Sequence, residues 1–268
     1  RGAYLSFDLA PRSQEILGSD YGRGVWEQVY DACLIVGPLP VQDSVLQRIH
    51  MSGIPYLALG QTDAFPEGSC ASVNFYEGAL QSTRFLLERG HKRIALLTTY
   101  EGYQAGVDRI RGYRDALAEK NIPFNPSLVA YGDPASGNLE EELTALLSQP
   151  GVTALIESTA FEDGELIRSA AEKSGHGAGD SLACVVWTYS RDEAVLPEAT
   201  AHLWLPVLEC SVEGIHELAL WMEGARSGPI QVLHSPVLSD APRPRAMSKP
   251  TRIGERLGFH VKNIRKRP

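Results

Sequence analysis

The sequence lacks any long hydrophobic run. No apolar stretch approaches the about 20 residues that a helix needs to cross a bilayer, and the first residues do not have the basic and then apolar layout of a secretion signal. Cysteine is scarce as well: the chain has four, far apart and without a CxxC spacing, which gives no disulfide framework. We therefore expect a cytoplasmic protein that does not enter a membrane, although a mature secreted protein would also have lost its signal.

Catalytic and metal-binding motifs are missing too. The sequence contains no GxSxG, no HExxH and no phosphate-binding loop, and its seven histidines are scattered. The glycine-rich segment at residues 175–179 follows a predicted helix and does not lead from a strand into one, so we interpret it as a connection and not as a dinucleotide loop. These absences predict a protein without catalytic residues, without a metal site and without a cofactor.

Positive charge is scarce in most of the chain and concentrated at its end. Residues 241–268 contain nine basic residues and one acidic residue, which leaves 16 basic and 32 acidic residues in the rest of the chain. A body this acidic repels DNA phosphates, so any DNA contact must come from another segment. The basic tail either lies against the acidic body of its own or a partner subunit, or binds DNA phosphates. The high local concentration of the body favours the first role.

What the sequence does contain is an alternation of helix and strand patterns, clearest in residues 72–133. Apolar residues recur there at the helical period, Gly90 ends this helix, and an unbroken apolar run of strand length follows at residues 94–97. A second amphipathic helix and a strand at residues 128–131 come next. Short connections between such elements predict an α/β fold in which helices cover a parallel sheet.

Many residues of this stretch match, in order and spacing, a pattern known from one protein family. They are Ser72-Val73-Asn74, Gly78-Ala79, the run ERGHKRIA at residues 88–95, Arg109, Gly112-Tyr113, Ala116-Leu117 and Gly132-Asp133. On these residues the chain resembles the lactose/galactose-repressor family of bacterial transcription regulators, over residues 4–238 and most closely over residues 72–133. The resemblance implies a two-lobed periplasmic-binding-protein-like fold, each lobe a parallel sheet covered by helices, with an effector held in the cleft between the lobes.

The resemblance also divides the chain into segments. Residues 1–77 and 206–228 form the N-terminal lobe, residues 78–205 and 229–240 the C-terminal lobe, and residues 241–268 the basic tail. We expect a crossover near residues 202–206, then a helix at residues 212–223 and a return strand at residues 231–233.

One unit of the family fold is missing from this sequence. The family has an additional strand and helix directly before the strand that we predict at residues 32–36, and no turn residue precedes that strand here. Either the lobe has lost this unit, or two residues between positions 28 and 33 are not neighbours in the natural chain. The second explanation is favoured, because the loss of a strand from a sheet uncovers apolar faces of the core.

Polar residues at the carboxyl ends of predicted strands are candidates for effector contact, because ligands of open parallel sheets collect at that edge. Asp8 follows a strand at residues 4–7, with a turn or helix cap as its alternative role. Gln61 follows a strand at residues 54–59 and borders the cleft by resemblance, with a place in a polar loop as its alternative.

Arg109 is the cleft residue that matches the family motif. A guanidinium at this position can bind a hydroxyl, a carboxylate or a phosphate in fork geometry. The alternative is a surface ion pair with Asp108 or Asp115, of which Asp108 is a poor partner because adjacent side chains of a helix diverge.

Other cleft positions depart from the family. Sugar-binding members carry an Asn-Asp pair near Thr159, acidic residues around Tyr189 and an Arg-Gln-Pro sequence around Trp204. We retain Thr159, Tyr189 and Trp204 as candidate ligand residues, although the loss of the acids argues against a typical hexose. Together with Trp187, the two aromatic residues either stack on a flat ligand face or fill the cleft.

These features and the resemblance imply the effector-binding and dimerisation domain of a bacterial DNA-binding transcriptional regulator. Its expected partners are a small-molecule effector (a sugar or another polar metabolite), a second copy of the chain, and operator DNA. The DNA contact would be made through a helix-turn-helix headpiece that is not among these residues. Two alternatives stay open: a solute-binding protein of a transporter, which shares the fold, and an enzyme acting in the same cleft, for which the sequence shows no catalytic constellation.

Overall fold

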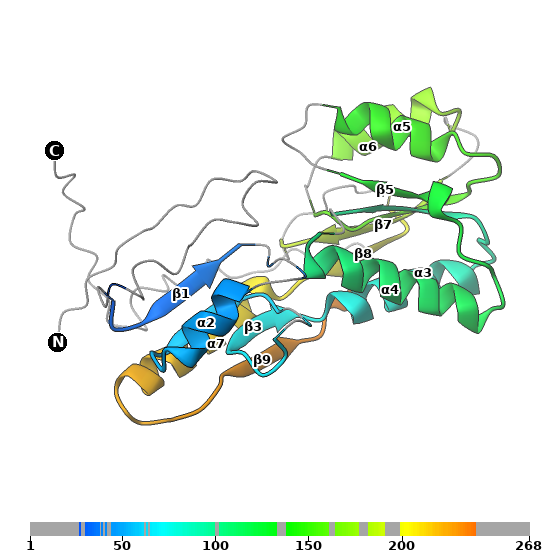
Figure 1. Cartoon of the computed structure of the whole chain (residues 1–268). Helices are drawn as coiled ribbons and strands as arrows, with labels where there is room; N and C mark the ends of the chain where they lie inside the picture. Colours follow the sequence, from blue (N-terminus) through cyan, green and yellow to red (C-terminus); the bar gives the residue numbers. More distant parts are fainter. Residues whose placement is uncertain are drawn as a thin grey trace, which may run out of the picture.

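Two sheets, each with helices on its faces, make up the chain in the computed structural model (Figure 1). The structure describes residues 27, 30–37, 39, 41, 44–61, 63, 65–99, 102–132, 138–160, 164–176, 182–190 and 199–239. The predicted α/β class is confirmed. Asp8, the basic tail and positions 28 and 29 of the predicted discontinuity lie outside the described residues.

The first sheet is parallel, in the order β1-β2-β3-β9. Its strands are β1 (Cys33–Val36), β2 (Tyr56–Leu59), β3 (Cys70–Val73) and β9 (Gln231–His234). Helix α2 (Ser44–Met51) packs on the face that carries Tyr56 and Ala58. Helix α7 (Val207–Met222) packs on the opposite face, against Leu57 and Ala71. Because neighbouring strand residues point to opposite faces, a strand covered on both sides has to be apolar throughout, and β2 is.

The second sheet has the order β10-β8-β7-β6-β4-β5, with only β10 antiparallel among its described strands. The strands are β4 (Ile94–Thr98), β5 (Val129–Tyr131), β6 (Ala154–Glu157), β7 (Ala183–Thr188), β8 (Ala201–Trp204) and β10 (Val237–Ser239). The helices are α3 (Phe75–Glu88), α4 (Gln104–Glu119), α5 (Leu139–Leu147) and α6 (Gly164–Lys173), with a 3-10 turn η2 (Pro126–Leu128) before β5.

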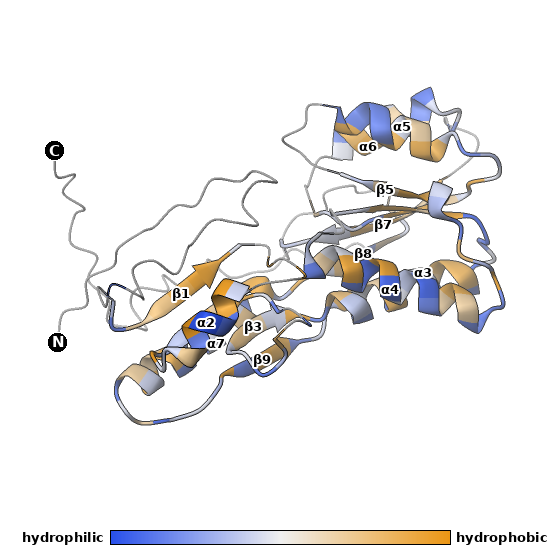
Figure 2. Cartoon of the chain, viewed as in Figure 1, coloured by the Kyte–Doolittle hydropathy of each residue, from blue (hydrophilic) through white to orange (hydrophobic). Residues whose placement is uncertain are grey.

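Strand alternation also builds the two cores of the second sheet. Ile94 and Leu96 face α3 and α4, whereas Ala95 and Leu97 face α5 and α6. The two helix pairs therefore lie on opposite faces of the sheet, each with its apolar side turned towards the strands (Figure 2). The unbroken apolar run that predicted a buried strand is explained by this double cover.

Two glycines of the family motif are required by close packing. A Cβ atom on Gly112 would lie 2.2 Å from the backbone oxygen of Tyr76, so only glycine lets α4 approach α3 at this point. A Cβ atom on Gly78 would lie 2.9 Å from the ring of Trp187. These two glycines of the motif are therefore needed where α4 packs closely on α3 and where the ring of Trp187 packs on α3.

Three expectations about the last third of the chain need correction. Residues 229–240 do not all belong with the C-terminal lobe, because β9 pairs with β3 of the first sheet and β10 with β8 of the second. The crossover expected near residues 202–206 is narrower, because β8 of the second sheet ends at Trp204 and α7, which packs on the first sheet, begins at Val207. Helix α7 begins at Val207, five residues before the predicted start at 212. Strand pairing and burial against a distant sheet, which local sequence does not encode, decided these elements.

The face of β1 on one side of the first sheet is uncovered. Leu34 is 39% exposed and Val36 is 71% exposed, although strands of a doubly covered parallel sheet are normally buried. The absence of a strand and helix beside β1 stays a prediction. Within the described residues, no helix combines the length and apolarity needed to cross a bilayer.

Candidate functional site

The carboxyl edge of the second sheet brings together Arg109, Thr159 and Tyr189, three of the predicted site residues. Arg109 projects from α4, and its Nη1 donates a hydrogen bond of 2.7 Å to the hydroxyl of Thr99, just after β4. Thr159 follows β6, and Tyr189 follows β7. The phenol of Tyr189 is close enough to act electrostatically on Arg109. Because β4, β6 and β7 are adjacent and parallel, their ends meet at one edge.

Arg109 is buried, with 2% of its surface exposed. Its guanidinium carbon lies 4.4 Å from the centroid of the Phe75 ring and 5.2 Å from that of Trp187. Burial lowers the pKa of Arg109 to about 10, so the side chain keeps its positive charge at neutral pH. A surface ion pair, the alternative role considered for Arg109, is excluded by this burial. Asp108, the poorer of the two partners considered, pairs with Arg111 at 3.1 Å, and Asp115 accepts a hydrogen bond from the hydroxyl of Tyr76 at 3.0 Å.

Glu157, at the end of β6, is a member of this site that sequence reasoning missed. Its side chain is fully buried, and Oε1 accepts hydrogen bonds from the backbone N–H of Thr159, at 2.7 Å, and from the hydroxyl of the same residue. Burial raises the pKa of Glu157 to about 7, while the bonds from Thr159, the charge of Arg109 and the backbone N–H of Ala160 act in the opposite direction. The only sequence signal was an acid as the last residue of an otherwise apolar strand, which does not indicate what surrounds the carboxyl group.

Three buried polar atoms of this edge have no hydrogen-bond partner in the described structure: Nε of Arg109, Oε2 of Glu157 and the hydroxyl of Thr98. Glu157 pairs in register with Leu97, so Thr98 and Glu157 end neighbouring strands. Just beyond them Ala160 has a φ of 56°, a strained conformation for a residue other than glycine. Unpaired buried polar atoms are costly, so their concentration beside a strained turn marks a place where a polar ligand can supply the partners. We name Thr98, Arg109, Glu157 and Thr159 the polar edge cluster.

The aromatic residues near this cluster have different roles. Trp187 is fully buried and stacks on Phe75, with ring centroids 6.4 Å apart and an interplanar angle of 8°. It therefore fills the core, one of the two roles considered for it. Trp204 is 5% exposed and lines a different, open cavity of about 420 Å³ at the end of β8. Tyr189, by contrast, is 49% exposed, so its side chain can reach a ligand.

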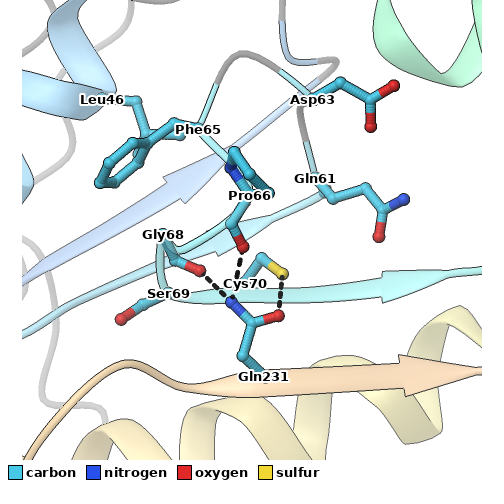
Figure 3. Close-up of a pocket in the computed structure, with 10 residues that line it drawn as sticks. Leu46, Gln61, Asp63, Phe65, Pro66, Gly68, Ser69, Cys70 and Gln231 are labelled. Atoms are coloured by element: carbon cyan, nitrogen blue, oxygen red, sulfur yellow. Dashed lines mark hydrogen bonds between the residues drawn. The ribbon is translucent and has the colours of Figure 1, made fainter.

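Gln61 lies in another cavity, of about 230 Å³, on the first sheet (Figure 3). The loop from β2 to β3 forms much of its wall. Gln231 closes one side by donating hydrogen bonds to the backbone oxygens of Pro66, at 3.2 Å, and of Gly68, at 2.5 Å. The structure thus places Gln61 on a cavity of its own and Trp204 on the cavity at the end of β8.

Contacts from loops of the first sheet close over the first turn of α4, the helix that carries Arg109. The backbone N–H of Val41 donates to the oxygen of Gly102 at 3.0 Å, and that of Gln104 donates to the oxygen of Leu39, also at 3.0 Å. Asp63 adds an ion pair with Arg111 at 3.3 Å. These bonds hold the two sheets together on this side.

Among the described residues, no group of three or more histidine, cysteine or acidic side chains could hold a metal ion. The polar edge cluster instead combines one cation, one carboxyl group and hydroxyls. Such a set can recognise a polar organic molecule by hydrogen bonds.

Comparison with known families adds a match over residues 10–179, to the model describing periplasmic binding proteins and the sugar-binding domain of the LacI family. The transcriptional regulator GalR of Salmonella typhimurium is 39% identical over 119 residues, which are 44% of this chain and 34% of that protein. CelR of Thermobifida fusca is 36% identical over 131 residues, 48% of this chain and 38% of that protein. The chain therefore spans well under half the length of the curated relatives it matches.

Solved structures agree on the fold. A LacI-family regulatory protein from Chloroflexus aggregans superposes with a TM-score of 0.68 at 21% identity, covering 85% of this chain and 82% of that one. The complex of the transcriptional regulator CelR with cellobiose superposes with a TM-score of 0.65 at 26% identity, covering 81% of this chain and 67% of that one.

Proposed function

The chain belongs to the family of periplasmic binding proteins and LacI-family sugar-binding domains, and from this premise we propose that it is the effector-sensing part of a transcriptional regulator. Family membership confirms the resemblance inferred from residues 72–133. The curated relatives reported above are transcriptional regulators, which favours this role over that of a transport protein or an enzyme.

The observation that carries the proposal is the polar edge cluster. It lies at the carboxyl edge of a parallel sheet, where ligands of such folds bind, and it offers a buried cation, a buried carboxyl group and unpaired polar atoms. The complex of CelR with cellobiose supports a sugar or a similar polar molecule as the effector class for this chain. Asp8, Gln61, Thr159, Tyr189 and Trp204 remain proposed contacts of that effector.

The proposed mechanism is a shift between two arrangements of the sheets. The bonds between Val41 and Gly102 and between Gln104 and Leu39 hold one arrangement, in which Arg109 is closed off. An effector that binds the polar edge cluster favours whichever arrangement it contacts better, and it shifts the population by its difference in affinity for the two. A thermal-shift screen of sugars, nucleosides and organic acids tests the proposal: stabilisation by one class identifies the effector, whereas no response from any class argues against sensing.

Substitution of Arg109 by alanine is expected to weaken effector binding by about 1–3 kcal/mol, because a charged hydrogen bond to the ligand is lost. Isothermal titration calorimetry with the molecule found in the screen measures the change. Arg114→Ala removes the same charge from an exposed position of α4, over the ring of Phe124, and should leave binding unchanged. Equal affinities for the wild type and Arg109→Ala would assign Arg109 a purely structural role.

We further propose a cytoplasmic homodimer that reads operator DNA, because two-fold symmetric operators are bound by two-fold symmetric proteins. The proposed interface uses the region of α2 and part of the second sheet, and the DNA contact belongs to a headpiece outside this sequence. Light scattering at about 20–50 micromolar protein should give twice the chain mass of 29.2 kDa. A mass of one chain at these concentrations would contradict the dimer without affecting effector binding.

A further inference from the structure

We propose that Glu157 selects the effector by charge, admitting a neutral molecule rich in hydroxyl groups and rejecting an anion. The inference rests on the effector-sensing function proposed above and assigns the selection to a residue outside the family motif. It starts from the polar edge cluster, in which Glu157 is the one carboxyl group. Glu157 ends β6, two residues before Thr159, and accepts hydrogen bonds from that residue.

The two oxygens of Glu157 have separate tasks. Oε1 accepts both hydrogen bonds from Thr159 and so holds the turn that contains the strained Ala160. Oε2 is buried and has no partner in the described structure. If the carboxyl group served only the turn, a glutamine would do so without burying a charge, and an unpaired buried oxygen would remain unexplained. The free oxygen is therefore the part of Glu157 that a ligand can use.

Electrostatics makes this oxygen selective. Arg109 is the cation whose charge acts on Glu157, and both side chains are closed off from water. Together they are neutral when Glu157 is ionised. The charge of Arg109 is already balanced by Glu157, so a phosphate or carboxylate on the ligand would bring an unbalanced negative charge into a site closed off from water, where such a charge is costly. A neutral ligand meets no such penalty.

The unpaired atoms also fit hydroxyl groups better than anions. Nε of Arg109 can only donate a hydrogen bond, Oε2 of ionised Glu157 can only accept one, and the hydroxyl of Thr98 can do either. Hydroxyl groups of a sugar both donate and accept, so neighbouring hydroxyls can satisfy all three atoms. The ionised carboxylate of an acid has no hydrogen to donate to Glu157.

The test is calorimetry at pH 8.5, where Glu157 is ionised, with neutral and acidic probes that share a pyranose ring: glucose and glucuronate, galactose and galacturonate. We expect the wild type to bind at least one neutral sugar about tenfold or more tightly than its acid. Glu157→Gln keeps the size of the side chain and an oxygen for Thr159, and it should reduce this preference to about threefold or less, mainly by improved binding of the acid. Glu119→Gln, at the exposed far end of α4, makes the same charge change and should keep the full preference.

Each outcome decides between this inference and the proposed function. If the wild type binds sugar and acid equally well, or Glu157→Gln keeps the wild-type preference, Glu157 is not the selector, while the sensing function stands. If no probe of either kind binds the wild type, sensing of sugars fails and the inference fails with it. Melting temperatures establish that each variant is folded. Should Glu157→Gln not fold, Glu157→Leu, which matches the apolar residues of β6, removes the same charge, and an unchanged preference in that variant overturns the inference equally.

Discussion

Replacement of Trp187 by alanine is expected to lower the free energy of unfolding by about 3–5 kcal/mol, the usual cost of emptying a fully buried tryptophan site. The side chain has no exposed surface, stacks on Phe75 and donates a hydrogen bond of 3.0 Å from Nε1 to the hydroxyl of Ser82. Its ring also fills the space left by Gly78, so the neighbouring backbone cannot easily collapse into the cavity. Urea denaturation followed by circular dichroism measures the loss.

Tyr189→Ala provides the matched control for Trp187. Tyr189 lies two residues later and is 49% exposed, so its truncation should change the free energy of unfolding by about 0.5 kcal/mol or less. A similar small effect for Trp187→Ala would mean that the ring does not support the core. In that case stacking on a ligand would again be the better explanation of the residue.

The second large effect is a pH dependence of stability caused by Glu157. The folded-state pKa is about 7, against an ordinary value of 4.5, so between these two values the folded protein binds more protons than the unfolded chain. The free energy of unfolding therefore falls as pH rises from about 4.5 to about 7, by about 3 kcal/mol from this residue. Well below pH 4.5 the burial of Glu157 no longer lowers the free energy of unfolding, because the carboxyl group is protonated in the folded and in the unfolded state.

A comparison of the wild type with Glu157→Gln isolates this contribution, since other titrating groups act in both proteins. Glutamine stays neutral and its amide oxygen can accept the bonds from Thr159. The variant should therefore match the wild type near pH 4.5 and exceed its stability by about 3 kcal/mol above pH 7. Urea unfolding at intervals of one pH unit gives the difference. A difference that does not change with pH would show that Glu157 is not buried as a neutral acid.

The site was partly predictable because one of its members belongs to a motif. Arg109 stands at a fixed distance from Gly112 and Tyr113, so the resemblance located it without knowledge of its surroundings. Its burial between Phe75 and Trp187 was not predictable, since these residues come from a different helix and from a strand almost eighty positions later. Glu157 was missed for the same reason. Its Oε2 has no hydrogen-bond partner in the described structure, and this depends on neighbouring strands that are distant in the sequence.

Sequence periodicity by itself determined the α/β class, the double cover of the second sheet and most of its elements, because burial on two faces requires unbroken apolar runs and helices show their own period. The tertiary structure alone decided that β8 is a strand, that residues 229–240 divide between the two sheets, and that a carboxyl group stays buried beside Arg109. Pairing, burial and charge state depend on residues that are distant in the chain and adjacent only in the fold. The local sequence therefore does not indicate which residues those neighbours are.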